Sequence, residues 1–164
     1  MLNDPDFKLT YRRALGTFVT GVTVMTAVDS QLSAGLTVNS FTSVSLTPPL
    51  VLWCLGDRSD RRTIFSEANT FGINVLGADA RDVAERFAWG DWRLRPDDLD
   101  ESPPGAPRIR GSLTHLACRV RERIVLGDHM IIVGEVETFD THAGEGLVFF
   151  RGGYGRTSCE TVST

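Results

Sequence analysis

The chain has 164 residues, of which 41% are hydrophobic and 23% are charged, values that are ordinary for a globular protein. This length predicts one domain, residues 1–164, that is large enough to bury a substantial core. The formal net charge of -4 gives no electrostatic reason to expect a nucleic acid or an anionic membrane as a partner.

The first predicted element is an amphipathic helix that begins near Asp4-Pro5 and ends near Gly16. Its apolar residues recur at three- and four-residue steps, and proline is tolerated in a first helical turn. Residues 19–28 are rich in β-branched side chains, which predicts a strand, and Asp29-Ser30 predicts the turn after it.

Residues 33–49, SAGLTVNSFTSVSLTPP, alternate between apolar and small polar side chains. This period of two predicts β-structure with one face toward a core and the other toward a hydrogen-bonding partner. The predicted core-facing residues are Leu36, Val38, Val44 and Leu46. We expect a break at residues 39–41, because Asn and Ser favour turns and the run is long for one strand. Two interpretations remain open, a site for a planar heterocycle or an edge strand that faces water.

A basic turn follows the next strand. Residues 50–55 are almost continuously apolar, which predicts a central strand, starting after Pro48-Pro49 and buried on both faces. Ser59 is then a predicted N-cap for a short helix that ends near Ala68, and its neighbours include Arg58, Arg61 and Arg62. A helix N-terminus beside these cations would suit a phosphate. The alternative is a capped surface helix with solvated arginines.

The second half of the chain predicts further β-structure. Strands are expected at residues 71–76, 112–123, 130–139 and 147–150, with a helix over 80–88 whose Phe87 faces the core. The strand at 112–123 should have one wet face, formed by His115, Ala117, Arg119 and Arg121. The proline-rich residues 90–111 predict a lid, a binding loop or a disordered excursion, and Gly152–Gly155 a flexible tail motif. Six or so antiparallel strands with a few helices predict a mainly β, Greek-key barrel.

The cysteines and histidines indicate neither a disulfide framework nor a metal site. Cys54, Cys118 and Cys159 are odd in number and form no C-x-x-C pair, and the three histidines lack metal-site spacing. Cys54 is expected to be a small buried residue rather than a redox thiol. The start of the chain lacks the apolar region of a signal peptide, and no apolar run is long enough to span a bilayer. A cytoplasmic enzyme is therefore expected.

Five segments carry a resemblance to a known family. They are RRALGTFVTGVTVMTA at 12–27, SAGLTVNSFTSVSLTPPLVLWCL at 33–55, NVLGADARDVAERFA at 74–88, GDHMIIVGEVE at 127–137 and LVFFRGGYG at 147–155. In this order they resemble the short-chain flavin reductases of two-component monooxygenases. The resemblance implies the antiparallel split β-barrel that binds FMN, with a few flanking helices.

The resemblance also implies a set of binding residues. The flavin, FMN or FAD, would contact Thr37, Val38, Asn39, Ser40, Cys54, Leu55, Asp57, Ser59, Arg61 and Arg62. The hydride donor, NADH or NADPH, would contact His129, which otherwise is only a turn residue, and Tyr154, which otherwise anchors the C-terminal segment. No catalytic side chain is implied, because hydride passes directly from the nicotinamide to the flavin.

The implied function is an NAD(P)H:flavin oxidoreductase, a homodimer that supplies reduced flavin to a partner monooxygenase. Within enzymes, the alternative is a split-barrel flavoprotein that retains its flavin and reduces another small molecule. A hypothesis from another class is a non-catalytic flavin-binding module.

Overall fold

The structure is a computed structural model that describes residues 4–29 and 32–158. Its helices are α1 (Pro5–Leu15), α2 (Arg62–Glu67), α3 (Arg81–Trp89) and the 3-10 turn η1 (Pro96–Asp98). Its strands are β1 (Thr20–Gly21), β2 (Thr23–Val28), β3 (Ser33–Val38), β4 (Thr42–Leu46), β5 (Pro49–Gly56), β6 (Thr70–Val75), β7 (Leu99–Asp100), β8 (Arg108–Ile109), β9 (Thr114–Leu126), β10 (His129–Thr141), β11 (Leu147–Phe150) and β12 (Gly153–Arg156). Ser30 of the predicted turn and Cys159 lie outside the described residues.

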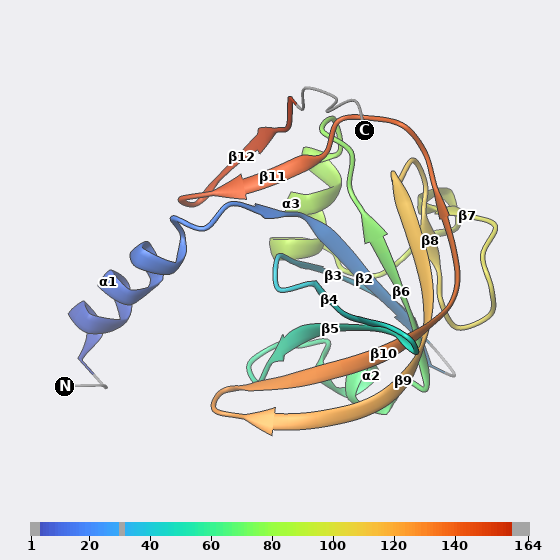
Figure 1. Ribbon diagram of the computed structural model, residues 1–164, viewed down its shortest axis with the longest axis horizontal. Helices are drawn as coiled ribbons and strands as arrows, with labels where there is room; N and C mark the ends of the chain where they lie inside the picture. Colours follow the sequence, from blue (N-terminus) through green and yellow to red (C-terminus); the bar gives the residue numbers. More distant parts are fainter. Residues whose placement is uncertain (1–3, 30–31, 159–164) are drawn as a thin grey trace.

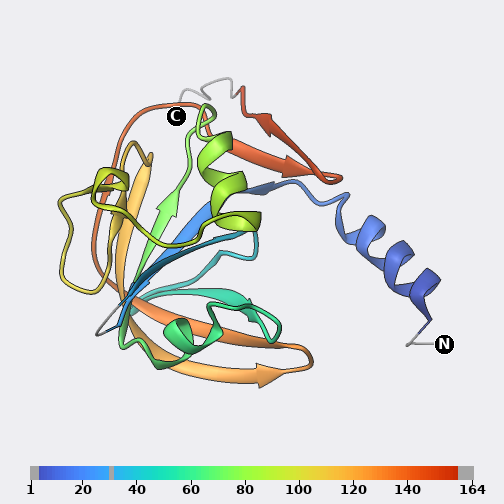
Figure 2. The same cartoon turned by 180° about the vertical axis from the view of Figure 1, so that it is seen from behind.

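The main sheet has seven strands in the order β3-β2-β6-β9-β10-β5-β4, and every neighbouring pair is antiparallel. It curves strongly, so that its two edge strands, β3 and β4, run close together (Figures 1 and 2). Register shifts at Val133/Gly134 and Val136/Thr138 interrupt the long β9–β10 pairing. Such irregularities increase bending, which helps the sheet to close toward a barrel. Two small sheets, β1-β11-β12 and β7-β8, complete the fold.

The mainly antiparallel β prediction is confirmed, but several of its details are wrong. The strand predicted at residues 19–28 is divided into β1 and β2, and Gly152–Gly155, predicted as a flexible tail, belongs largely to β12. Residues 90–111 are not a featureless loop, because they contain η1, β7 and β8. The number of strands in the described part of the chain is therefore about twice that expected from the sequence.

Trp53 forms the centre of the larger core cluster, and its side chain is fully buried. Its ring lies 5.2 Å from that of Phe65 and 6.0 Å from that of Phe71, both edge to face. On β5 only alternate residues are fully buried, so the prediction of burial on both faces is wrong. β5 lies next to the edge strand β4, which explains why one of its faces is only half covered.

A second core cluster lies under α3 and includes Val24, Leu76 and Phe87. Phe87 is 1% exposed, as expected for a core residue. α3 packs closely on β3 because Gly35 has no side chain: a Cβ there would lie 2.5 Å from the Phe87 ring. This contact fixes α3 beside the end of β3, where the polar segment begins.

Asn74 joins the sheet to the segment that precedes β9. Its buried amide Nδ2 donates to the Val24 carbonyl at 3.0 Å, and its Oδ1 accepts from the Ile109 N–H at 2.7 Å. The same segment covers His115, whose Nε2 lies 3.1 Å from the Ala106 carbonyl. His115 and Ala117 are consequently buried, and the prediction that they belong to a wet strand face is wrong.

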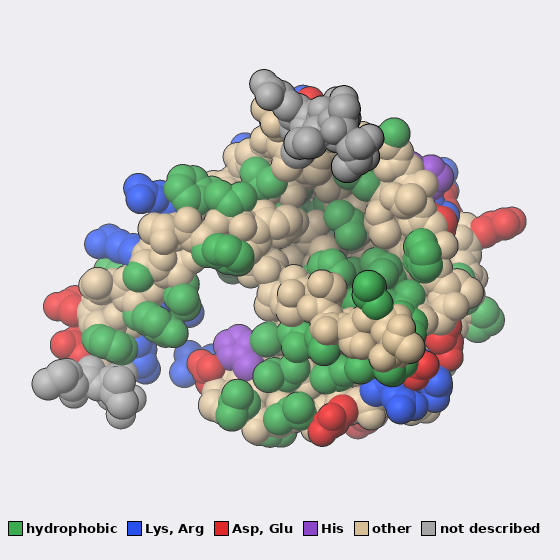
Figure 3. Space-filling view, in the orientation of Figure 1, with side chains coloured by type: hydrophobic (Ala, Val, Ile, Leu, Met, Phe, Trp, Pro, Cys, Tyr) green, Lys and Arg blue, Asp and Glu red, His purple; other side chains and the backbone are tan. Residues whose placement is uncertain are grey.

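Two apolar surfaces remain uncovered. α1 has no buried residue and extends away from the rest of the molecule in both views (Figures 1 and 2). Val44 and Leu46, predicted to face a core, are 52% and 92% exposed on the edge strand β4. Figure 3 shows open space between the N-terminal helix and the body, with hydrophobic side chains on both sides of it. Among residues 4–29 and 32–158, no helix combines the length and hydropathy required to cross a membrane.

Candidate functional site

The polar segment at residues 37–40 comprises the end of β3 and the two residues after it, and hydrogen bonds to two other elements hold it. The Thr37 hydroxyl donates to the Ala84 carbonyl of α3 at 2.8 Å. The Ser40 hydroxyl accepts from the Cys54 backbone N–H of β5 at 3.0 Å. β3 ends at Val38, and β4 begins at Thr42, so the break expected at residues 39–41 is confirmed. The segment is thus a short polar bridge between the two edges of the curved sheet.

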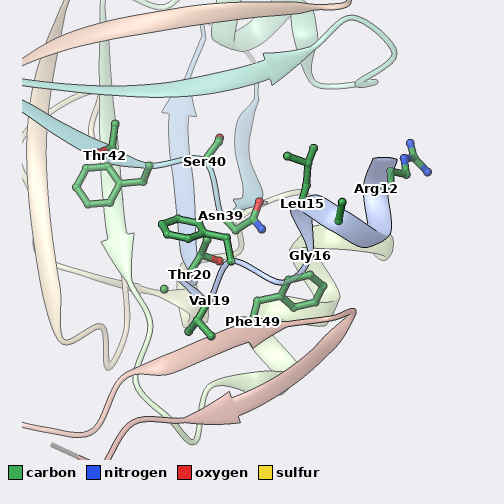
Figure 4. Close-up of a pocket in the computed structure, with 13 residues that line it drawn as sticks. Arg12, Leu15, Gly16, Val19, Thr20, Asn39, Ser40, Thr42 and Phe149 are labelled. Atoms are coloured by element: carbon green, nitrogen blue, oxygen red, sulfur yellow. The ribbon is translucent and has the colours of Figure 1, made fainter. Parts of the chain in front are cut away.

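A cavity of about 1060 Å³ lies between this bridge and the N-terminal segment. Figure 4 shows Asn39 and Ser40 near Leu15 and Gly16, with Val19 farther along the N-terminal segment beside Thr20. Arg12 lies at its outer end, and Phe149 of β11 forms part of its wall. We call it the arm cavity, because the segment around α1 forms much of its wall. It combines a large apolar surface with polar side chains at residues 39–40, as binding sites for flat organic molecules do.

A second cavity, of about 480 Å³, lies where residues 37–39 face α3 and β12. We call it the α3–β12 pocket. Tyr154 lines it, and the ring centroids of Tyr154 and Phe149 are 5.3 Å apart. Partial burial raises the pKa of the Tyr154 hydroxyl above its ordinary value. Since Asn39 lines both cavities, the polar bridge separates them.

The predicted phosphate turn has a different geometry from the expected helix cap. α2 begins at Arg62, and no side-chain hydrogen bond caps it. The Ser59 hydroxyl accepts from the Arg61 backbone N–H at 3.3 Å, and the Arg62 N–H donates to the Ser59 carbonyl at 3.1 Å. The prediction of Ser59 as an N-cap is therefore wrong, because the chain makes an additional tight turn before the helix.

The arginines of this turn are less exposed than expected. Arg62 pairs with Asp57, whereas the Arg61 side chain is buried and its Nε lies 3.4 Å from an Asp60 carboxylate oxygen. Burial lowers the pKa of Arg61. Its Nε makes no hydrogen bond within the part of the chain that the structure describes. A buried guanidinium N–H without an acceptor is a group that an anionic oxygen can satisfy, so this turn fits a flavin phosphate.

His129 lies beside this turn rather than beside Tyr154. It is paired with Gly56 across β10 and β5, and a Cβ on Gly56 would lie 3.5 Å from the His129 Nε2. Its Nδ1 is 2.8 Å from the Asp128 carboxylate, and the side chain is about half exposed. Tyr154 lies in a different sheet, and the described residues that line its cavities do not include His129. The structure therefore separates the two residues predicted for the nicotinamide side.

The two β5 residues predicted to contact the flavin, Cys54 and Leu55, differ in how accessible their side chains are to a ligand. Leu55 is fully buried in the core, so its backbone, rather than its side chain, is what remains for a ligand. Cys54 is only partly buried, which differs from the expected small core residue. Cys118 is the buried thiol, and burial raises its pKa to about 12. Cys118 is therefore a packing residue, because the thiolate is the reactive form.

The sequence analysis did not identify the contribution of α3 to the site. Arg81, Glu85 and Trp89 are spaced four residues apart and line the α3–β12 pocket together. This spacing places side chains on one face of a helix, so the stripe was visible in the sequence. Phe149 and Arg12, which line the arm cavity, had no comparable signal because they come together only in three dimensions.

Comparisons with known proteins agree with this geometry. A model of the flavin reductase-like domain matches residues 15–158. The FMN reductase (NADH) SmoA of Agrobacterium fabrum is 45% identical over 148 residues, which cover 90% of this chain and 85% of that protein. The flavin-dependent monooxygenase reductase subunit HsaB of Rhodococcus jostii is 35% identical over 150 residues, covering 88% of this chain and 75% of the subunit.

A solved structure has the same fold. The NADH:FAD oxidoreductase SgcE6 of Streptomyces globisporus, in complex with NAD and FAD fragments, superposes with a TM-score of 0.85. It is 39% identical to this chain, and the match covers 94% of this chain and 95% of that one.

Proposed function

Because this chain belongs to the flavin reductase-like domain family, we propose that it is an NADH-dependent flavin reductase that supplies reduced FMN or FAD to a partner monooxygenase. The observation that carries this proposal is the 45% identity to an NADH-dependent FMN reductase over 90% of the chain. The mainly antiparallel β-fold with its helices matches the solved flavin reductases, so the predicted split-barrel fold is confirmed. We infer further that residues 1–164 act as one domain, in the cytoplasm, where reduced nicotinamide is produced.

The proposed roles follow from where the side chains lie. When bound, the flavin supplies the ring that accepts a hydride from the reduced nicotinamide. Thr37, Val38, Asn39 and Ser40 would hold that ring, and Cys54, Leu55 and Asp57 would lie along its side chain. Ser59, with Arg61 and Arg62, would bind the phosphate, and the buried Arg61 Nε, which makes no hydrogen bond within the described residues, supports this. His129 and Tyr154 would contact the nicotinamide nucleotide from opposite sides. No side chain is proposed as a general acid or base.

The function is tested by steady-state oxidation of NADH and NADPH with FMN, FAD or riboflavin added. We expect turnover with NADH that saturates as flavin is added. Turnover that does not depend on added flavin would favour the flavoprotein that retains its cofactor. If no combination supports turnover although flavin binds, the chain is a binding module instead.

We predict a homodimer. The exposed apolar residues of α1, which include Phe7, Tyr11 and Leu15, and of edge strand β4 support this, because a two-fold partner would bury them. Sedimentation at micromolar concentration should therefore give twice the monomer mass. A fully active monomer would contradict the prediction.

We also predict weak flavin binding, with the phosphate end contributing much of the affinity. A reductase that supplies a separate oxygenase must release reduced flavin, which suits micromolar affinity, about -8 kcal/mol, better than nanomolar, about -12 kcal/mol. The purified protein should lose flavin on gel filtration and bind riboflavin more weakly than FMN. Flavin that stays bound through extensive dialysis would contradict this.

The Ser59→Ala variant should narrow the difference in affinity between FMN and riboflavin by a few-fold, because one hydrogen bond to the phosphate is lost. Ser66→Ala is the matched control, since the Ser66 hydroxyl donates to a carbonyl of its own helix, that of Thr63, at 3.0 Å. Isothermal titration with the two flavins measures the change. An unchanged ratio in Ser59→Ala would remove the Ser59 hydroxyl from the phosphate site.

A further inference from the structure

Besides Thr37, Val38, Asn39 and Tyr154, which already have proposed roles, the α3–β12 pocket is lined by residues to which no role has been assigned. Its walls come from the end of β3, from one face of α3 and from β12 with the turn before it. The α3 face contributes Arg81, Glu85, Ala88 and Trp89. At about 480 Å³ the pocket has room for a nucleoside-sized group but not for a complete dinucleotide.

Trp89 is the most unusual side chain of this pocket. It is 85% exposed at the end of α3, although tryptophan is among the residues that are most buried on average. A second aromatic side chain, Tyr154, lines the same pocket from β12. Large exposed aromatic faces at a cavity are suited to stacking on a planar base, which is insensitive to the identity of the base.

The polar groups of the pocket suit the rest of a nucleotide. Arg81 Nε donates to Glu85 Oε1 at 2.8 Å, and the Arg81 guanidinium lies 5.8 Å from the centre of the Tyr154 ring. Among the described residues, the bond from Arg81 is the hydrogen bond that the Glu85 carboxylate accepts. Its second oxygen, Oε2, can therefore accept a hydrogen bond from a ribose hydroxyl. Carboxylates are the usual acceptors of ribose hydroxyls in dinucleotide sites, and an arginine can bind phosphate.

The remaining wall permits a close approach to the backbone. Gly152 and Gly153 line the pocket without side chains, and Gly152 has a φ of +85°, which favours glycine. The opposite wall is Thr37, Val38 and Asn39, the proposed ring-binding segment. A group in this pocket would therefore lie against the segment that is proposed to hold the flavin ring.

We propose that the α3–β12 pocket binds the adenosine group of a dinucleotide, with the base stacked on Trp89 and the ribose bound by Glu85. This inference rests on the proposed function, because a flavin reductase meets two dinucleotides that contain adenosine, NADH and FAD. The chemistry recognised is the same in both, and binding experiments separate the two sources.

The test compares wild type with Trp89→Ala and with Phe139→Ala, a control that removes a 71% exposed ring from β10. Dissociation constants are measured by isothermal titration for AMP alone, for FAD against FMN, and for NADH against reduced nicotinamide mononucleotide. We expect Trp89→Ala to weaken AMP binding about tenfold, which lies within the range that base–aromatic stacking contributes. Phe139→Ala should leave all five constants unchanged.

The paired ligands identify the source of the adenosine. A selective loss for FAD but not FMN assigns the pocket to the flavin, and a selective loss for NADH but not its mononucleotide assigns it to the hydride donor. If Trp89→Ala changes neither pair selectively, or if wild type does not bind AMP, the proposal is overturned. Each of these is an equilibrium measurement with a single ligand and involves no turnover, so the results remain decisive even if the chain fails to oxidise NADH and the proposed function is wrong.

Discussion

Replacing Asn74 with alanine should lower the free energy of unfolding by about 2–4 kcal/mol, because it leaves buried polar groups without partners. Asn74 is fully buried, and its amide bonds to the Val24 carbonyl on one side and the Ile109 N–H on the other. Its Nδ2 also lies 3.3 Å from the Thr26 hydroxyl. Alanine would remove all of these hydrogen bonds and leave a cavity, while water could not reach the Ile109 N–H. Urea denaturation followed by tryptophan fluorescence measures the change.

The matched control is Asn69→Ala, because Asn69 is exposed and the hydrogen bond it makes uses its backbone carbonyl, which accepts from Val120. Its unfolding midpoint should stay close to that of wild type. If Asn74→Ala also unfolds at the wild-type midpoint, the buried network does not contribute to stability. The segment that Asn74 holds also covers His115, so we expect the same variant to expose that histidine to solvent.

Replacing His129 with alanine should impair use of the nicotinamide by tenfold to a hundredfold, corresponding to roughly 1–3 kcal/mol for a lost polar contact and stacking surface. The half-exposed ring is oriented by the Asp128 carboxylate at 2.8 Å and lies over Gly56, where no side chain obstructs it. Such a ring is available to a ligand. Steady-state kinetics should show a raised KM for NADH, while the dissociation constant for FMN stays near the wild-type value.

His142→Ala serves as the control, since His142 is another exposed histidine, held by Arg108 at 2.6 Å. It should not alter either constant. Because His129 is next to the predicted phosphate turn, the variant also distinguishes two roles. A loss of FMN affinity with an unchanged KM for NADH would assign His129 to the flavin phosphate, and no change in either would make it a turn residue only.

Strands could be predicted from the sequence where the pattern of neighbouring residues alone determines them. The strand at residues 33–38 and the Asn-Ser-Phe break depend on short stretches of sequence, and both are confirmed. Val44 and Leu46 have the same alternation, but they lie on an edge strand whose outer face is not covered by any of residues 4–29 and 32–158. Periodicity identifies a strand but not its neighbours, so the exposure of these two residues could not be predicted. His115 shows the opposite case, since a segment distant in sequence buries it.

Only the part of the candidate site that lies within one short stretch of sequence could be predicted. Residues 37–40 form one contiguous stretch, and the structure places them at a cavity wall. The turn around Ser59 was recognised by its composition, but its arginines were misjudged, because the burial of Arg61 depends on packing that the sequence does not display. The opposing walls, from α3 and from β11–β12, lie more than forty residues away along the chain and meet the segment only through the fold.

The position of Asn39 between the two cavities has a thermodynamic consequence. Asn39 and Phe149 line both the arm cavity and the α3–β12 pocket, so the occupants of these cavities touch the same two side chains. If one occupant shifts this shared wall, the affinity for the other changes, and reciprocity requires the same factor in both directions. A coupling of only 1.4 kcal/mol would correspond to about tenfold in each affinity. The order in which substrates bind and products leave would then be determined by two residues that carry out no chemistry.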